Sequence, residues 1–153
     1  MTSKPTERTE AGEWRYALRL LGVRDRSEHE VRQRLAQRGL ESDGIERIVQ
    51  RLYRYRYLDD SRFAEGVAQR GARRGHGRIR VRSELAAKGI DKTVAEEAIA
   101  STFVDEETLA RQALHKRYKT TPTDDAARAR AARFLLQRGF PQRLVLAILK
   151  EGC

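Results

Sequence analysis

Hydrophobic and small residues recur along the chain at a step of 50 residues. Three segments share a leucine, a cation, a glycine and an apolar residue in the same order: LAQRGL at 35–40, LAAKGI at 85–90 and LLQRGF at 135–140. Four positions before each of these leucines stands a small or apolar residue, namely Val31, Val81 and Ala131. Matches at several positions over two successive steps indicate an internal repeat.

Each copy of the repeat predicts a helix, a glycine stop and another helix. Val31 and Leu35 are four residues apart, so they share one helical face. A cation before each glycine suits the negative end of the helix dipole. We interpret the glycines as structural residues that end the helix in the left-handed conformation, and they are Gly39, Gly89 and Gly139.

Helix starts can also be recognised. Ser27 and Glu30 form a capping box, and Asp59 or Asp60 can open a helix that carries Phe63. One more helix precedes each helix that ends in glycine, which gives three helices per copy and about nine in all. The segment RIRVR alternates like a strand, but the repeat aligns it with helical segments, so we predict a helix there.

The predicted fold class is all-α, with three tandem three-helix repeats that form an elongated, curved helical array. The expected organisation is a disordered N-terminal tail at 1–11, followed by repeats at 12–57, 58–103 and 104–153. Only three prolines interrupt the 153 residues, which leaves most of the chain free to be helical.

The formal net charge of +10 and the isoelectric point near 10.3 indicate a polyanionic partner. Charge alone leaves nucleic acid, an acidic protein face and a membrane surface open, as well as an ordinary arginine-rich helix surface. The sequence has no apolar run long enough for a membrane span and no secretory signal. A single cysteine, Cys153, excludes a disulfide or a cysteine-based metal site within one chain. We therefore expect a cytoplasmic protein.

Candidate catalytic chemistry is sparse. The histidines His29, His76 and His115 are scattered and lack a second metal ligand at a usual spacing. The sequence contains neither a glycine-rich phosphate loop nor a nucleophile elbow. Asp59 and Asp60 resemble a carboxylate pair for Mg²⁺, but neighbouring side chains at a helix entry diverge, so capping is the better interpretation. We expect no enzymatic activity, no metal and no cofactor.

The strongest local signal is a basic stretch in the middle copy, which comprises Arg70, Arg73, Arg74, Arg78, Arg80, Arg82 and Lys88. On a helix, Arg80, Glu84 and Lys88 form one row in which Glu84 can pair with both cations. The row with Arg78 and Arg82 is less compensated. Because the arginine fork suits phosphate and carboxylate groups, the stretch predicts a basic binding surface.

Aromatic and basic residues alternate just before this stretch, from Tyr53 to Tyr57. The arrangement of Arg54, Tyr55 and Arg56 could stack on nucleic-acid bases, so these three are possible DNA contacts. Tyrosines at a spacing of two cannot all share one helical face. We therefore also expect at least one of the three tyrosines to pack in the core.

Two segments resemble a known family. YLDDSRFAE at 57–65 and GRIRVRSELAAKGI at 77–90 resemble the central signature of the RecX family of recombinase regulators. The resemblance extends from about Ala17 to Leu149, is most specific at 57–90 and is looser in the third copy. Members of that family are tandem three-helix repeats, which is the architecture derived above from the period.

This resemblance implies a regulator that binds the RecA–DNA filament and inhibits strand exchange, ATPase and coprotease activities, in recombination and the SOS response. The implied partners are the RecA filament and, weakly and in a salt-sensitive way, single- and double-stranded DNA. A monomer is expected. The alternative is a stand-alone DNA-binding protein of the helix-turn-helix type, since each copy is a set of helices with a turn.

Overall fold

The computed structural model describes residues 5–150, with the backbone alone for residues 5–9. Within that range the chain forms nine α-helices and no strand: α1 (Pro5–Val23), α2 (Glu28–Gln37), α3 (Ser42–Arg54), α4 (Asp60–Arg73), α5 (Arg78–Ala87), α6 (Lys92–Thr102), α7 (Glu106–Tyr118), α8 (Asp125–Gln137) and α9 (Gln142–Lys150). The segment RIRVR lies in α5, so the helical prediction there is confirmed. Cys153 lies outside the described residues.

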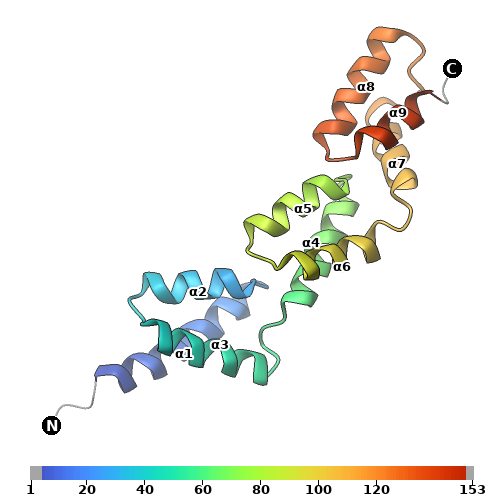
Figure 1. Ribbon diagram of the computed structural model, residues 1–153. Coiled ribbons are helices and arrows are strands. Elements are labelled where there is room, and N and C mark those ends of the chain that lie inside the picture. The colour runs from blue at the N-terminus through green and yellow to red at the C-terminus, as the bar shows by residue number, and fades with distance from the viewer. Residues whose placement is uncertain (1–4, 151–153) are drawn as a thin grey trace.

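Each consecutive set of three helices encloses its own hydrophobic core. The equivalent leucines of the repeat, Leu35, Leu85 and Leu135, are all completely buried. Figure 1 shows the three units following one another in an elongated array, with the two ends of the chain far apart. The predicted all-α array of three tandem three-helix repeats is therefore confirmed. Leu58, which we placed in the second repeat, packs in the core of the first unit.

The middle helix of every unit ends in a Schellman motif at its glycine. The backbone φ is 90° at Gly39, 72° at Gly89 and 92° at Gly139, which is the left-handed region that favours glycine. In the first unit the Leu40 amide donates to the Leu35 carbonyl at 3.2 Å. Equivalent bonds recur fifty residues on in both other units. The structural role predicted for these glycines is confirmed.

The first two units are joined where the N-terminus of α2 meets the C-terminal turn of α5. The Ser27 hydroxyl donates to the Lys88 carbonyl at 2.7 Å and accepts from the Glu30 amide at 3.2 Å. The same serine thus completes the predicted capping box and bridges two units. The ring of His29 lies so close to Gly89 that a Cβ there would come 2.3 Å from the ring Cγ, and a side chain at Gly89 would force the units apart.

The second joint repeats the first at a step of fifty residues. The Gly77 amide donates to the Arg138 carbonyl at 2.8 Å, and the Ile79 amide donates to the Gly139 carbonyl at 3.0 Å. Here backbone meets backbone directly. A Cβ on Gly77 would lie 2.5 Å from the Gly139 oxygen, so only glycine allows this approach. The repeat therefore specifies how the units are stacked as well as how each unit folds.

A carboxylate from the first helix of the following unit completes each joint. Asp60 accepts from the Glu28 amide at 2.8 Å, at the N-terminus of α2. Glu106 accepts from the Arg78 amide at 2.9 Å, at the N-terminus of α5. Asp59 instead caps its own helix, α4, as predicted. The two adjacent carboxylates thus bind the N-termini of different helices: Asp59 caps α4, and Asp60 binds α2 and so links two units.

The N-terminal end of the array differs from the prediction. Helix α1 begins at Pro5, so the expected disordered tail at 1–11 is wrong from that residue onward, and residues 1–4 lie outside the described range. The reason is local, because proline suits the first turn of a helix and the residues after it include good helix formers. Glu13 of α1 is buried and pairs with Arg38 of its own unit at 2.7 Å.

The carboxyl group of Asp60 leads us to expect that the stability of the folded chain depends on pH in a distinctive way. Burial raises the pKa of Asp60 above its ordinary value of 3.8, and the neighbouring charges of Glu28 and Asp59 act in the same direction. The folded chain therefore holds the proton more tightly than the unfolded chain, and ionisation costs stability as the pH rises through the raised pKa. Asp60→Asn, which keeps an acceptor oxygen, should be at least as stable as the parent at pH 7.

Chemical denaturation of the two proteins across a pH series tests this prediction. The stability advantage of Asp60→Asn should shrink as the pH falls through the raised pKa toward 3.8, because the parent then becomes protonated. Asp60→Ala is the matched control: it leaves the Glu28 amide without its acceptor and also lacks the titrating group, so it should be less stable than Asp60→Asn by about 1–2 kcal/mol at all pH values. A constant gap between parent and Asp60→Asn over the whole series would contradict the assignment.

Candidate nucleic-acid interface

Three of the predicted cations border a groove between the second and third units. Arg73 and Arg74 are exposed at the end of α4, and Arg80 is exposed on α5. Two adjoining hollows of about 410 and 670 Å³ lie between these residues and helices α7 and α8. We call them together the joint groove, and its cations are Arg73, Arg74, Arg80, Lys116, Arg117, Arg130, Arg133 and Arg138.

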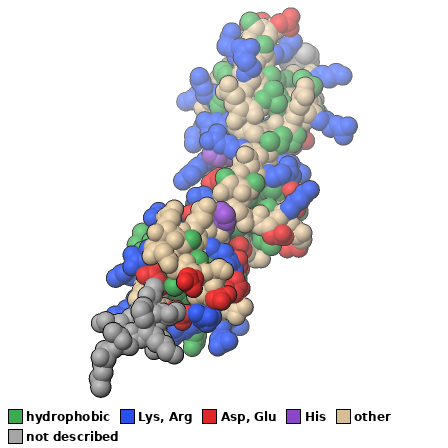
Figure 2. Space-filling view, turned by 60° about the vertical axis from the view of Figure 1, so that its left-hand side comes forward, with side chains coloured by type: hydrophobic (Ala, Val, Ile, Leu, Met, Phe, Trp, Pro, Cys, Tyr) green, Lys and Arg blue, Asp and Glu red, His purple; other side chains and the backbone are tan. Residues whose placement is uncertain are grey.

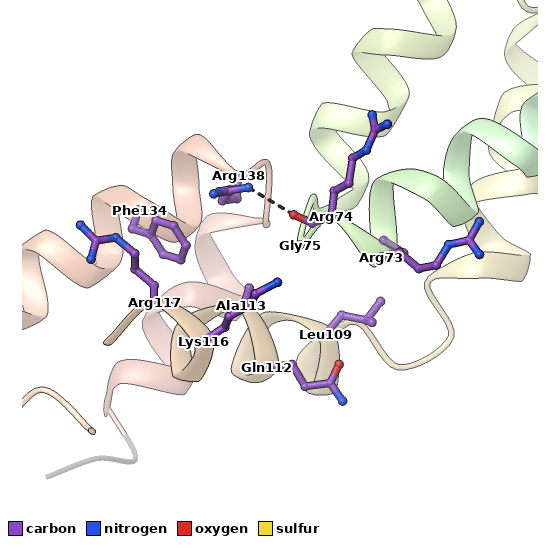
Figure 3. A pocket seen from close by; sticks show the side chains of 11 residues that line it. Arg73, Arg74, Gly75, Leu109, Gln112, Ala113, Lys116, Arg117, Phe134 and Arg138 are labelled. Carbon is purple, nitrogen blue, oxygen red and sulfur yellow. Dashed lines mark hydrogen bonds between the residues drawn. The ribbon is translucent and has the colours of Figure 1, made fainter. Parts of the chain in front are cut away.

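Residues with cationic side chains line the joint groove from both units. Figure 3 shows Arg73 and Arg74 on one side of the smaller hollow, with Lys116, Arg117 and Arg138 on the other. No carboxylate lines either hollow among the residues that the structure describes. The groove is thus a concave surface of one sign of charge, which concentrates the positive potential toward any anion that enters it.

Most of these cations have no acidic partner. Within residues 10–150 no ion pair forms at Arg73, Arg74, Arg80, Arg117, Arg130 or Arg133. Burial, followed by the charges of Arg80 and Arg138, lowers the pKa of His76, so this histidine adds no charge to the groove at neutral pH. The guanidinium groups therefore keep their hydrogen-bond donors available for an external anion.

Aromatic rings hold two of the arginines in place. The guanidinium of Arg138 lies 5.1 Å from the ring centre of Phe134, and that of Arg117 lies 5.1 Å from the ring centre of Tyr118. The two rings meet edge to face at 5.9 Å. Arg138 also donates from Nη1 to the Arg74 carbonyl at 3.2 Å, across the joint (Figure 3). Arg138 thus lines the groove and also bonds across the second joint.

The structure corrects the prediction for Arg78 and Arg82. Arg78 pairs through Nε with Glu106 at 2.5 Å, and Arg82 binds both oxygens of Glu96, at 2.6 and 3.2 Å. The hydrogen bond from Arg82 lowers the pKa of the Glu96 carboxyl. The row of Arg78 and Arg82, which we expected to be less compensated by acids, is therefore neutralised by ion pairs. Its acids come from α6 and α7, which sequence proximity on α5 does not reveal.

The row of Arg80, Glu84 and Lys88 is also corrected. No pair between these three residues forms in the described chain; instead the Lys88 ammonium lies 3.6 Å from Glu30 of the first unit. Lys88 therefore contributes to the first joint, whereas Arg80 lines the joint groove. The guanidinium of Arg70 lies over Gly66 of its own helix, outside the two hollows.

The tyrosines at the end of the first unit are all exposed, by 39% at Tyr53, 56% at Tyr55 and 50% at Tyr57. The expectation that at least one of them packs in the core is therefore wrong. Buried aliphatic residues already fill the core face of α3, and the chain turns away after Arg54, with Leu58 filling the core instead. Arg54 and Arg56 are exposed as well, so the possible DNA contacts at 54–56 lie on the surface.

Sequence reasoning missed the half of the groove that belongs to the third unit. These residues are Lys116, Arg117, Arg130, Arg133 and Arg138. A signal was present in RARAARFLLQR at 128–138, because the step of fifty places Arg130 opposite Arg80. Figure 2 shows Lys and Arg side chains gathered over the upper part of the molecule, while Asp and Glu are more frequent lower down.

Comparison with known proteins identifies three matching segments. Family models described as the first, second and third three-helix domains of RecX match residues 14–52, 59–99 and 105–149. Together these matches cover most of the chain, and their order follows the three units. The resemblance that we inferred from about Ala17 to Leu149 is therefore confirmed, in the third unit as well as at 57–90.

Individual relatives agree with this. A protein named "Regulatory protein RecX" from Chromohalobacter salexigens is 40% identical over 81% of this chain and 82% of its own length. One of the same name from Serratia proteamaculans is 32% identical over 88% of this chain and 94% of its own length. A crystal structure of RecX from Lactobacillus salivarius superposes with a TM-score of 0.79 at 23% identity, covering 95% of this chain and 97% of that one.

No helix among the described residues combines the length and the apolar composition that a transmembrane span requires.

Proposed function

Since the chain belongs to the RecX family, we propose that it binds the RecA–DNA filament and inhibits the activities of RecA, namely strand exchange, ATP hydrolysis and coprotease activity. The proposed role is that of a regulator without catalysis of its own. Its place would be in recombination and the SOS response, in the cytoplasm.

The joint groove is the observation that carries the DNA part of this proposal. Cations from two units line the joint groove, and among the described residues no carboxylate lines it. Arginine forks bind phosphate through two parallel hydrogen bonds, and phosphate contacts release counterions, so we expect binding that weakens steeply with salt. We therefore propose that the groove receives phosphates of the DNA within the filament.

The shape of the chain supports a filament as partner. The three units form an elongated array (Figure 1), and the joints between them consist of direct hydrogen bonds together with side chains in close contact. Such joints keep the units at fixed spacing, and an extended surface of this kind suits a long, regular partner. A globular partner would contact only part of it.

Two features argue against a stand-alone helix-turn-helix protein. The third helix of the middle unit, which would enter a DNA groove, carries Glu96 and Glu97 next to each other. In addition, the N-termini of α2 and α5 are occupied by contacts with the following unit. If the middle helix were the recognition helix instead, its N-terminal residues would have to contact base edges, and in α2 and α5 these residues are not available.

The proposal predicts inhibition of RecA at low ratios. The ATPase rate of RecA on single-stranded DNA should fall when this protein is added at well below one molecule per RecA, because one bound molecule blocks a filament that many RecA subunits share. The measurement is a coupled ATPase titration. The same titration with additional free DNA is the control, since inhibition that DNA removes would reflect sequestration of the substrate. Unchanged ATPase at every ratio would contradict the proposal.

A further inference from the structure

A second surface, in the first unit, combines aromatic rings with cations. Trp14 of α1 meets Tyr55 and Tyr57, which follow α3, at ring-centre distances of 6.3 and 6.4 Å, and the two tyrosines are 6.4 Å apart. The guanidinium of Arg51 lies 4.0 Å from the centre of the Trp14 ring. We call Trp14, Arg51, Tyr55 and Tyr57 the aromatic cluster.

Core packing does not explain the aromatic cluster. The rings of Tyr55 and Tyr57 are half exposed, and Trp14 packs only partly against the first core. The backbone itself presents the two tyrosines, because Arg56 between them has a φ of 60°. A residue other than glycine in this left-handed conformation costs about 1 kcal/mol. The chain therefore holds these large apolar side chains in solvent at some cost, and such patches commonly mark binding sites.

The three rings do not cover one another's faces. The three ring pairs are inclined by 45° to 64°, so no two rings are stacked face to face. Separate faces at different inclinations suit successive flat groups on a flexible chain. A single apolar side chain from a folded protein would instead require a depression between the rings.

The charge around the aromatic cluster points to the same kind of ligand. Arg51 lies over the Trp14 ring, and Arg54 and Arg56 are exposed on either side of Tyr55 in the sequence. In the described part of the chain none of these three arginines is in an ion pair. Aromatic faces combined with unpaired arginines are the chemistry that binds single-stranded nucleic acid, with bases on the rings and phosphates on the cations.

We propose that the aromatic cluster is a second DNA site, at which unpaired bases of single-stranded DNA stack on the exposed rings of Tyr55 and Tyr57, next to Trp14. Its contribution differs from that of the joint groove, because stacking requires free base faces, which a duplex does not offer. The cluster would therefore give the chain a preference for single strands, and this part of the binding should persist at salt concentrations that weaken phosphate contacts. The inference rests on the proposed DNA contact but not on RecA.

Trp14 makes a direct test possible, since it is the only tryptophan in the chain. Its fluorescence, excited where tyrosine does not absorb, should be quenched when an oligothymidylate of about 15 nucleotides is added. The same strand in a duplex and an abasic strand of equal length should leave the emission almost unchanged. Binding of each strand is followed in parallel through the anisotropy of a label on the DNA.

A pair of variants tests the tyrosines. Tyr55→Ala with Tyr57→Ala should weaken oligothymidylate binding by about tenfold or more, and should leave abasic-strand binding unchanged. Tyr53→Ala is the matched control, because this tyrosine lies by Glu28 rather than in the aromatic cluster. This variant should bind oligothymidylate as tightly as the parent does. Helical content from circular dichroism confirms that both variants fold.

Three results would overturn the inference. One is an equal quench by the abasic strand, which would mean that phosphates alone act on Trp14. A second is tight oligothymidylate binding with no change in Trp14 emission, which would leave the joint groove as the DNA site. The third is a double variant that binds DNA normally but fails to inhibit RecA, which would make the aromatic cluster a protein contact. If no strand binds at all, the proposed DNA contact of the groove fails as well.

Discussion

Replacing Arg117 and Arg133 together with glutamine is expected to weaken binding of single-stranded DNA by about 10- to 100-fold at low salt. Both arginines are exposed and line the joint groove, and neither forms an ion pair within residues 10–150, so the substitutions remove the proposed phosphate ligands without breaking an ion pair described there. If each of them contacts one phosphate, the slope of log affinity against log salt should fall by about 0.7 per contact.

The matched control removes the same charge elsewhere. Arg15 and Arg19 are exposed on α1, one turn apart, and lie outside the groove. Their joint replacement with glutamine lowers the net charge equally, so an effect of the groove and an effect of total charge can be separated. We expect a change of less than about threefold and a nearly constant salt slope. Equal losses in both double variants would mean that no particular surface binds DNA.

Gly77→Ala is expected to disrupt the second joint. Its Cβ would lie 2.5 Å from the Gly139 oxygen and 2.7 Å from the Phe140 Cα, and backbone atoms cannot move aside as a flexible side chain can. Such overpacking costs about 1–3 kcal/mol or more, and any separation of the units also breaks the hydrogen bond from Gly77 to Arg138. Because the joint groove is built from both units, DNA binding should weaken as well.

Hydrogen exchange and chemical denaturation measure this effect. In Gly77→Ala the amides of residues 77 and 79, which donate across the joint, should exchange much faster than in the parent. Gly12→Ala is the control, because a Cβ there meets nothing within 4 Å and the site lies inside α1. It should stabilise the chain by up to about 1 kcal/mol. Unchanged amide protection and stability in Gly77→Ala would contradict the described joint.

The sequence was sufficient to predict what depends on neighbours along the chain. The period of fifty predicted the units, the left-handed glycines and the helix at 78–82, because capping and helical periodicity act within a few residues. Positions that form the joints between units also recur at this step. The capping residue Ser27 and its equivalent Gly77 bond to the C-terminal turn of the middle helix in the next unit, but only the folded chain shows that the two positions have the same role.

The failures concern pairings between helices. Arg78 is neutralised by Glu106, which lies 28 residues away, and a helical row on α5 gives no information about it. The exposed tyrosines were misjudged for a related reason, since α3 ends at Arg54 and the helical face that we assumed stops there. The third unit's half of the groove was overlooked because basic residues were compared along the sequence rather than across the joint, where Arg130 and Arg80 line one hollow.

Photo-crosslinking from inside the joint groove tests the central claim most directly. Gln137 lines the groove, is exposed and carries no charge, so a photoreactive residue can replace it with little disturbance. After irradiation with RecA filaments on labelled DNA, we predict covalent adducts with the DNA strand. The same group at Leu146, which is exposed on α9 outside the groove, should give few of them. Adducts from position 137 that contain RecA alone, with none on DNA, would contradict the account.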